Sequence, residues 1–378
     1  MTQLHIGVIG AGGRSQVLKG LEHDPRVELS AVMDVSPDRL KWFGKEVSSS
    51  ARAFTDLKAM LAQKDLDAVA VMSPDALHEE HAVQALKAGK HVYLEKPMAT
   101  SIEACDKIIA TSAEVQRQVM VGFNMRFMPI FITMREIIGR GDIGDVKAVW
   151  VRHFVGRGGD YYFHDWHAQR AEVFSLMLQK ASHDLDMIHW LTGRKTIKVA
   201  GFGGLDYFGG NHPNDLHCSH CDEQDTCSER NDNERNLCAF RRDVDVEDNE
   251  VAVLELEGGI KAAYLQCQFS AEYHRNFTII GTKGRIENLE AEGAIVIRRR
   301  RLTNAPVVDD EVVHVAPDPG HQQADREVLT TWIESLVARS APPISGLEGR
   351  HSVAVGVKIA ESIRQGGDPL YVPEYQEK

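Results

Sequence analysis

The feature that most constrains the fold is an alternation of short apolar runs with amphipathic stretches between residues 4 and 123. The amphipathic stretches, such as SPDRLKWFGKEV and HEEHAVQALKAG, have the periodicity of helices. Apolar runs that barely alternate and are separated by helices indicate a parallel sheet covered on both faces. The N-terminal part is therefore predicted to be a doubly wound α/β sheet. Its strands are expected at LHIGVI (4–9), VELSAVMD (27–34), DAVAVM (67–72), KHVYLE (90–95) and QVMVGF (118–123).

The pattern changes after about residue 140, where the apolar residues recur with a period of two. Leu254 and Leu256, for example, alternate with glutamates. This period is typical of an antiparallel sheet with one face exposed to water. Two helices are expected to close the chain, near 321–339 and 347–365.

The length of 378 residues favours two domains over one. We place the first, the domain of the parallel sheet, at residues 1–124. The second, at residues 125–378, is predicted to be an α/β domain with a large open, mostly antiparallel sheet. A cysteine-rich insertion interrupts it at about 211–242.

The composition argues against two classes of partner, nucleic acids and membranes. The formal charge of -12 argues against nucleic-acid binding. The sequence contains no apolar run near the roughly 20 residues of a membrane span. The N-terminal MTQLHIGVIGAGG has neither a basic segment nor a small-residue cleavage site, so a cytoplasmic protein is expected.

The segment GVIGAGGRS follows the first strand and opens a predicted helix. Gly10 and Gly12 occupy the first two positions of the dinucleotide-binding fingerprint, with Gly13 and Arg14 beside them. The N–H groups of the helix would then bind the pyrophosphate. Ser15 stands where the third glycine is expected, which leaves open a simple glycine turn into a helix.

Asp34 ends the second strand, about 20 residues beyond the glycines, where a carboxylate can bind the ribose hydroxyls. It would also repel a 2′-phosphate, which favours NAD over NADP as the cofactor. The alternative is that Asp34 caps the helix that begins at Ser36-Pro37, and one carboxylate can serve both purposes.

The segment HVYLEKPMA places Glu95 and Lys96 directly after a buried strand and Pro97 behind them. The carboxyl ends of parallel strands form the ligand crevice of such a sheet. The proline fixes the backbone and permits a cis peptide. Lys96 is therefore a candidate catalytic residue, and the alternative is a surface lysine paired with Glu95.

Five segments resemble the glucose-fructose oxidoreductase/inositol dehydrogenase (Gfo/Idh/MocA) family of NAD(P)-dependent oxidoreductases. The resemblance extends over roughly residues 4 to 365. Its residues are Ser73-Pro74, His78, Ala85-Leu86, Gly89-Lys90-His91-Val92, Glu95-Lys96-Pro97, Asn124, Arg126, His183, Asp186, Trp190 and the segment IIGTKGRIE at 279–287.

The resemblance implies a Rossmann domain followed by an α/β domain whose open sheet often forms the interface of a homodimer or homotetramer. It also implies that the substrate lies between that sheet and the nicotinamide. The residues implied to contact the cofactor are Ser73, Pro74, His78, Glu95, Lys96 and Asn124.

Oxidation of a carbinol requires removal of the hydroxyl proton. His183 is the better formal base, because an imidazole ordinarily titrates near pH 6.5. Asp186 would share its helix face and orient it, although His183 could instead make only structural bonds. Many relatives carry an aspartate four residues before the histidine, but this chain has Gln179 followed by Lys180. Lys180 is either a second active-site cation or a solvated lysine.

The segment GRGGDYYFHDWHAQR at 156–170 is rich in groups that suit a sugar. Flat aromatic faces can cover C–H bonds, and the polar side chains between them can bind hydroxyls; packing of the loop against its own domain explains the aromatics equally well. The candidate substrate-binding residues are Arg126, Tyr161, Tyr162, His164, Asp165, Trp166, Arg170 and His274.

Four cysteines, Cys218, Cys221, Cys227 and Cys238, lie in a polar loop that is not expected to bury a core of its own. Four thiolates suit a closed tetrahedral zinc site, which would be structural. The sequence therefore predicts structural zinc, with an iron–sulfur cluster, free thiols or disulfides as alternatives.

The leading hypothesis is an NAD-dependent oxidoreductase that oxidises a secondary hydroxyl of a sugar, glycoside or cyclitol, with Lys96, His183 and Lys180 as catalytic residues. A second hypothesis is a glycosidase that keeps NAD bound and makes no net redox change, as some relatives do. A third is a non-catalytic nucleotide-sensing regulatory protein.

Overall fold

The computed structural model describes residues 3–156, 161–289, 292–301, 310–316 and 321–377, and the chain divides into two compact units. Unit 1 comprises Met1–Met128, Asp318–Val353 and Glu374–Lys378, and unit 2 comprises Pro129–Pro317 and Ala354–Pro373. Each unit thus contains segments that are far apart in the sequence. A single boundary near residue 124 would place the C-terminal segments of unit 1 in the second domain. None of the helices in the described ranges combines the length and apolar character that a membrane crossing demands.

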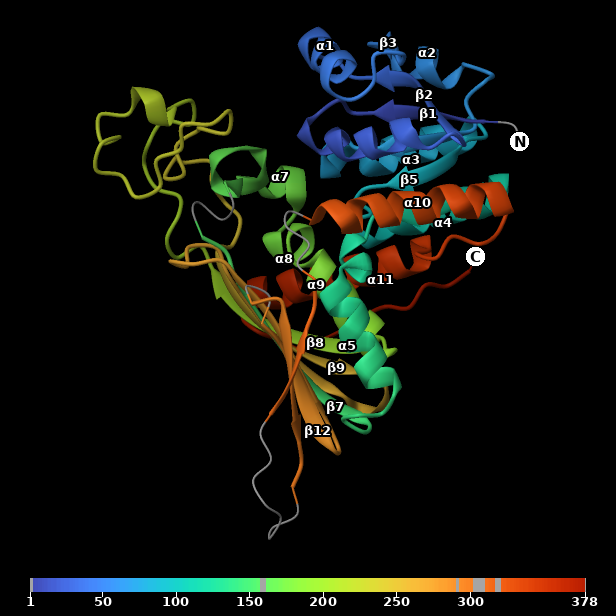
Figure 1. Cartoon of the computed structure of the whole chain (residues 1–378). Coiled ribbons are helices and arrows are strands. Elements are labelled where there is room, and N and C mark those ends of the chain that lie inside the picture. The colour runs from blue at the N-terminus through green and yellow to red at the C-terminus, as the bar shows by residue number, and fades with distance from the viewer. Residues whose placement is uncertain (1–2, 157–160, 290–291, 302–309, 317–320, 378) are drawn as a thin grey trace. The chain divides into compact units, whose positions relative to one another are not determined.

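Unit 1 contains the predicted parallel sheet (Figure 1). Within the described residues it has six strands in the order β3-β2-β1-β4-β5-β6, and neighbouring strands pair in parallel. This order is that of dinucleotide-binding sheets. The strands are β1 (Leu4–Ile9), β2 (Val27–Met33), β3 (Arg52–Phe54), β4 (Ala68–Val71), β5 (His91–Leu94) and β6 (Val119–Val121).

Some helices of unit 1 begin at residues whose side chains cap the first turn. Ser36 and Ser101 accept hydrogen bonds from the backbone N–H groups of Arg39 and Ala104, at 3.4 and 3.1 Å. The elements are the 3-10 helices η1 (Gly13–His23), η2 (Asp75–Leu77) and η3 (Asn124–Phe127), and α1 (Pro37–Glu46), α2 (Leu57–Leu61), α3 (His78–Lys87), α4 (Ile102–Val115) and α10 (Gln322–Ala338). Helix α11 (Gly346–Arg364) begins in unit 1 and ends in unit 2.

Helix α10 packs on this sheet although it comes from the C-terminal part of the chain. The rings of Tyr93 on β5 and Trp332 on α10 lie 5.3 Å apart, and both side chains are fully buried. The C-terminal segment therefore completes the core of the nucleotide-binding unit.

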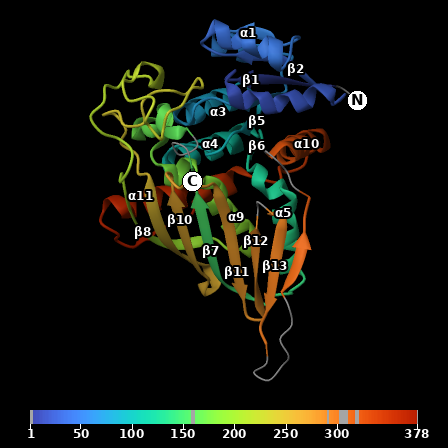
Figure 2. The same cartoon turned by 60° about the vertical axis from the view of Figure 1, so that its left-hand side comes forward.

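Unit 2 is built on the predicted large sheet (Figure 2). Over the described ranges its nine strands follow the order β14-β13-β12-β11-β7-β10-β9-β8-β15, and all pairs are antiparallel except β10 with β7. The strands are β7 (Val146–Phe154), β8 (Thr196–Gly204), β9 (Asn249–Leu256), β10 (Lys261–Cys267), β11 (His274–Gly281), β12 (Gly284–Leu289), β13 (Ala294–Arg299), β14 (Glu311–His314) and β15 (Leu370–Tyr371).

One face of this sheet is covered by helices and the other is open, as the period of two predicted. On β7, Val149 and Val151 are buried, whereas Trp150 between them is 49% exposed. The remaining elements are α5 (Pro129–Gly139), α7 (Arg170–Val173), α8 (Leu176–Gln179), α9 (Ser182–Thr192) and the 3-10 helices η4 (Tyr162–His164), η5 (Trp166–Ala168), η6 (Cys218–His220) and η7 (Glu257–Gly259).

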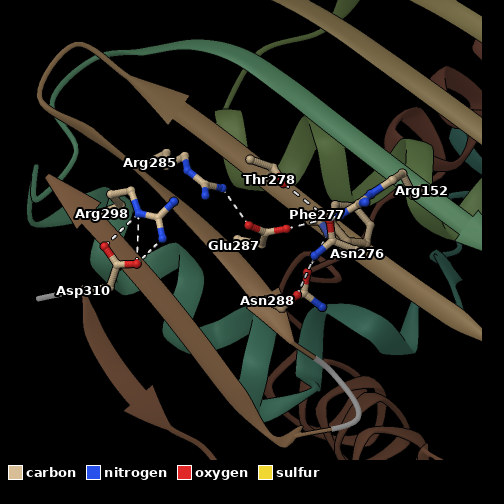
Figure 3. A network of polar contacts seen from close by, with 9 residues as sticks. All are labelled: Arg152, Asn276, Phe277, Thr278, Arg285, Glu287, Asn288, Arg298 and Asp310. Carbon is tan, nitrogen blue, oxygen red and sulfur yellow. Dashed lines mark hydrogen bonds and ion pairs between the residues drawn. The ribbon is translucent and has the colours of Figure 1, made fainter. Parts of the chain in front are cut away.

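Part of the open face is a charged network that crosses four strands (Figure 3). Arg152 donates hydrogen bonds to Asn276 and Glu287 at 2.7 and 3.2 Å, and Arg285 bonds the same glutamate at 2.6 Å. On β13, Arg298 is paired with Asp310. These contacts hold the side chains of neighbouring strands in register.

Residues 205–248 form an insertion between β8 and β9, and both general views show this segment beside α7 (Figures 1 and 2). Its regular structure consists of η6 and isolated bridges that pair His212 with Arg241 and His217 with Leu237. Side-chain packing and individual hydrogen bonds therefore determine its conformation.

Candidate active site

The glycine turn after β1 has the geometry that a bound dinucleotide requires. Gly10 has φ +95°, and a Cβ there would lie 2.8 Å from the backbone carbonyl carbon of Met72. A Cβ on Gly12 or Gly13 would meet no described atom within 4 Å, so the space before the turn is open. Gly12 is the N-cap of η1 and has no side chain to cover its first N–H groups. The turn fits a pyrophosphate.

Asp34 connects this turn to the start of α1. Its Oδ2 accepts a hydrogen bond from the Ala11 N–H at 2.8 Å, and its Oδ1 accepts one from the Ser36 N–H at 2.9 Å. Each carboxylate oxygen has a further lone pair that can accept from a ribose hydroxyl. The structural role of Asp34 is thus compatible with ribose binding, which stays a prediction.

His78 joins the ends of β4 and β5. Its Nδ1 lies 2.8 Å from the Pro97 carbonyl oxygen and its Nε2 lies 2.9 Å from that of Ser73. Burial lowers the pKa of His78. The Lys96–Pro97 peptide is cis, as the sequence allowed, and the Lys96 side chain is half-buried.

Arg14, Glu95 and Asn124, predicted as cofactor ligands, meet around a fourth residue that the sequence did not reveal, Asp325 on α10. Arg14 bonds Glu95 at 2.8 Å and forms a bidentate pair with Asp325 at 2.7 and 3.0 Å. Asn124 donates to the same carboxylate at 2.8 Å. Burial acts to lower the pKa of Arg14, but these carboxylates outweigh it and raise that pKa. The cluster fixes the backbone that carries Lys96.

Arg126, a predicted substrate ligand in η3, forms an ion pair with Glu348 at 2.6 Å, and its side chain is 8% exposed. The pair belongs to unit 1, like the residues above. A role in substrate binding stays a prediction.

The second group of candidates lies in unit 2. His183 is half-buried on α9, and Lys180 is buried in the link between α8 and α9. The Lys180 Nζ lies 4.9 Å from the ring centroid of Tyr162. The ring of His167 stacks with that of Tyr162, with centroids 4.2 Å apart, and with that of Trp166, with centroids 3.7 Å apart. The structure thus brings the predicted second cation to the aromatic segment.

The polar residues of this segment have partners in their own domain. The His164 Nδ1 lies 2.7 Å from the Leu237 carbonyl oxygen, and Arg170 bonds Glu247 at 2.8 Å. Asp165 contacts the His167 Nδ1 at 2.5 Å, and Tyr161 has φ +67° before η4. Packing within the domain therefore accounts for much of the segment, and substrate binding by these residues stays a prediction.

His274 does not join the other candidates of unit 2. It lies opposite Phe154 in the sheet, with the two rings 5.9 Å apart. Its neighbour Arg275 points to the helix-covered face, where it contacts Asp184 of α9 at 3.3 Å. Because successive side chains alternate, His274 lies on the open face, away from α9.

Asp184, the residue after His183, anchors α9 to the sheet, and sequence reasoning missed it. Its carboxylate lies 2.8 Å from the His153 Nδ1, accepts a hydrogen bond from the Tyr264 hydroxyl at 2.9 Å, and pairs with Arg275. Arg275 lies 3.2 Å from the His153 Nε2. A neutral His153 that donates from Nδ1 and accepts at Nε2 satisfies both contacts.

The pKa values agree with this arrangement. Burial and the adjacent Arg275 lower the pKa of His153 to about 4. Burial acts to raise the pKa of Asp184, but Arg275 and His153 outweigh it and lower that pKa to about 2. No local motif marks His153 or Arg275, because their strands meet α9 only in the folded chain.

We expect acid to destabilise the protein through His153. The unfolded chain binds a proton at this imidazole below about pH 6.5, whereas the folded protein does so only near pH 4. Stability is therefore lost as the pH falls through this window, by on the order of 3 kcal/mol. Urea denaturation between pH 7 and 4 measures the free energy of unfolding of the wild type and of His153→Gln. If this free energy fell equally steeply with pH in the two proteins, the prediction would be contradicted.

The structure does not support the predicted zinc site. All four cysteines of the insertion are free thiols, and in the described ranges no group of three or more His, Cys, Asp or Glu side chains could hold a metal ion. The apolar residues of the insertion are buried in a core that they share with residues 163–176, so the insertion does not depend on a metal to bury them. The buried residues of this core are Phe163, Ala168, Val173, Leu176, Phe208, Ala239, Val244 and Val246.

Known proteins resemble this chain along its whole length. Inositol 2-dehydrogenase 2 of Saccharopolyspora erythraea is 26% identical over 371 residues, which cover 96% of this chain and 94% of the relative. The scyllo-inositol dehydrogenase of Lactobacillus casei, solved with NAD(H) and scyllo-inositol, has a TM-score of 0.74 at 23% identity and covers 98% of this chain and 99% of its own. The WlbA dehydrogenase of Bordetella pertussis, solved with NADH and UDP-GlcNAcA, has a TM-score of 0.76 at 22% identity, with 98% of both chains covered.

Family models match both halves of the sequence. The model of the oxidoreductase family's NAD-binding Rossmann fold matches residues 4–123. The model of the same family's C-terminal alpha/beta domain matches residues 135–372. The chain therefore belongs to the Gfo/Idh/MocA family of oxidoreductases.

Proposed function

We propose that this protein oxidises a secondary hydroxyl of a sugar, glycoside or cyclitol with NAD. The observation that carries the proposal is Lys96 at the carboxyl end of β5, on the same edge of the parallel sheet as the glycine turn after β1. The name of the Saccharopolyspora relative and the inositol bound to the Lactobacillus enzyme support the substrate class.

The reaction separates a secondary alcohol into a hydride, a proton and a carbonyl compound. When bound, NAD would supply the acceptor for the hydride. We assign the hydroxyl proton to the His183 imidazole, while the Lys96 ammonium donates a hydrogen bond to the substrate oxygen and stabilises its developing charge. Lys180, beside Tyr162, adds a second cation that favours polyhydroxylated substrates.

The test is a kinetic panel. The full chain is mixed with NAD and, in turn, myo-inositol, scyllo-inositol, D-glucose or D-galactose, and the absorbance of the reduced cofactor is followed. Turnover of at least one polyol is expected. A folded protein that binds NAD but reduces none of it across this panel would contradict the proposal.

The same assay tests the redox-neutral glycosidase. Nitrophenyl glucoside and galactoside are added, with and without NAD. Release of nitrophenol that depends on NAD but forms no net NADH would favour the glycosidase over the dehydrogenase.

We further propose that Asp34 selects NAD over NADP. We expect Asp34→Asn to raise the ratio of kcat/KM for NADP to that for NAD about tenfold, because it removes the charge that repels a 2′-phosphate. The control is Asp38→Asn, since Asp38 is exposed in the first turn of α1 and pairs with Lys41. An unchanged ratio in Asp34→Asn would show that other groups select the cofactor.

We also propose that the open face of the large sheet joins two copies of the chain. Trp150, Val253 and Phe202 are 49%, 56% and 63% exposed on this face, beside the charged network of Figure 3. Monomers rarely expose a patch of this kind, and apolar and charged halves on one face suit a two-fold interface.

Trp150→Glu is expected to convert the oligomer into a monomer, since it would bury a charge in the interface. Light scattering coupled to gel filtration measures the mass. Leu347→Glu is the control, because Leu347 is 50% exposed but belongs to unit 1, at the start of α11, and not to the sheet. A monomeric wild type would refute this assembly.

A further inference from the structure

The insertion between β8 and β9 is in close contact with the aromatic segment 161–170. We propose that it braces this segment and that Arg241 is the positioning residue of the brace, so that the insertion determines which carbohydrate the segment accepts. The assignment of a carbohydrate to this segment depends on the proposed function, whereas the brace itself does not.

Arg241 holds the segment by its main chain. Its side chain is 1% exposed, and its guanidinium donates to the carbonyl oxygens of Phe163 and, at 2.8 Å, Asp165. It also donates to the Cys238 carbonyl oxygen at 3.0 Å and pairs with Asp243 at 2.8 Å. Only the planar fork of an arginine can satisfy several acceptors in these directions at once.

Hydrogen bonds on both sides of Arg241 in the sequence extend the contact. His164 and Leu237 pair through two bonds: the Leu237 N–H donates to the His164 carbonyl oxygen at 3.2 Å, and the Leu237 carbonyl oxygen lies 2.7 Å from the His164 Nδ1. Further along, the Asp245 N–H donates to the Ala168 carbonyl oxygen at 3.1 Å, and the Asp245 carboxylate accepts from the Arg170 N–H at 2.7 Å. Residues 237–245 of the insertion therefore contact the aromatic segment between residues 164 and 170.

Apolar packing fixes the same segment from within. The rings of Phe163 and Phe208 stack with centroids 4.0 Å apart, and both side chains are buried. Val244 and Val246 of the insertion belong to the same buried cluster. The insertion thus contributes a core as well as hydrogen bonds.

The aromatic segment has little regular structure of its own. Its described elements between residues 161 and 169 are η4 and η5, of three residues each. Its internal main-chain hydrogen bonds are those of single turns, such as the bonds from the His164 N–H to the Tyr161 carbonyl oxygen and from the Gln169 N–H to that of Trp166. Isolated turns of this kind open easily unless their neighbours hold them. Tyr162 and Trp166, whose rings stack on His167 beside Lys180, therefore depend on the insertion for their positions.

Three variants of the full chain test the brace: Arg241→Met, Arg241→Lys and, as the matched control, Arg242→Met. Arg242 is exposed, and its Nε donates to the Asn211 carbonyl oxygen at 3.0 Å, within the insertion. Hydrogen exchange of the ligand-free proteins, followed by mass spectrometry, reports the opening of residues 161–170.

Exchange in this segment is expected to be about tenfold faster in Arg241→Met, since buried carbonyls lose their donors, with a smaller increase in Arg241→Lys and none in Arg242→Met. Peptides of the parallel sheet should be unchanged. With the best polyol of the panel, Arg241→Met should raise KM about tenfold and lower kcat less than threefold, with the NAD affinity unchanged. The ratio of kcat/KM between two polyols should also change.

Each outcome decides one part of the proposal. Unchanged exchange in Arg241→Met refutes the brace. Faster exchange with unchanged KM for every polyol refutes the role in carbohydrate binding and leaves a purely structural brace. If Arg241→Met does not fold, the comparison is made with Arg241→Lys, which keeps the charge. If the wild type oxidises no polyol, the proposed function and the substrate role fail together, and the exchange experiment alone decides the brace.

Discussion

Lys96→Met is expected to lower kcat/KM for polyol oxidation about a thousandfold while the NAD affinity changes less than about threefold. Methionine has nearly the length of lysine and no charge, so the substitution removes the hydrogen bond and the cation with little change in volume. Steady-state kinetics with the best polyol and a titration of NAD by protein fluorescence measure the two quantities.

The surroundings of Lys96 support an effect of this size. Lys96 follows a strand whose side chains Val92, Tyr93 and Leu94 are fully buried. Glu95 is bonded to Arg14, and the Pro97 carbonyl oxygen to His78, so the main chain on both sides is held. A group fixed in this way can stabilise charge on a substrate oxygen without reorganisation.

Two further variants make the prediction sharper. Lys87→Met, at an exposed lysine of α3, should keep full activity. Lys96→Arg keeps the positive charge but does not give up a proton, so partial activity in it would assign Lys96 to charge stabilisation. A loss below about tenfold in Lys96→Met would remove Lys96 from the catalytic residues.

Much of the fold could be predicted because its signals are local. A strand covered on both faces is apolar at nearly every position, as β4 shows, and a strand with one open face alternates, as β7 shows. The place of α10 in unit 1 could not be predicted, since it depends on Trp332 reaching Tyr93 from the other end of the chain.

Some residues of the candidate site could likewise be predicted from local motifs, and others could not. Gly10 and Asp34 belong to a motif within one strand–helix–strand unit, so their neighbourhood could be inferred. Asp325, His153 and Arg241 escaped notice because each acts on a segment that is distant in sequence. The zinc prediction is not supported, since in the described ranges no group of three or more His, Cys, Asp or Glu side chains could hold a metal ion. The core that the insertion shares with Phe163 could not be predicted, because Phe163 lies outside the insertion.

His183→Asn is expected to have the second large effect. It should lower kcat/KM for the polyol about a thousandfold, whereas the KM for the polyol should change less. The asparagine keeps a hydrogen-bonding side chain of similar shape but cannot accept the hydroxyl proton. Because Asp184 anchors the first turn of α9 through His153 and Tyr264, the substitution should leave the helix in place.

The pH profile separates a base from a structural histidine. In the wild type, log kcat/KM should rise with slope one at low pH and level off as the imidazole loses its proton, and His183→Asn should lose this limb. The control is His189→Asn on the same helix, where the Nε2 lies 2.9 Å from the Thr196 hydroxyl, and it should keep the limb. If His183→Asn retained the limb with only a lower amplitude, another group would be the base; the neighbouring Lys180, next to Tyr162, would then be the first to examine by Lys180→Met.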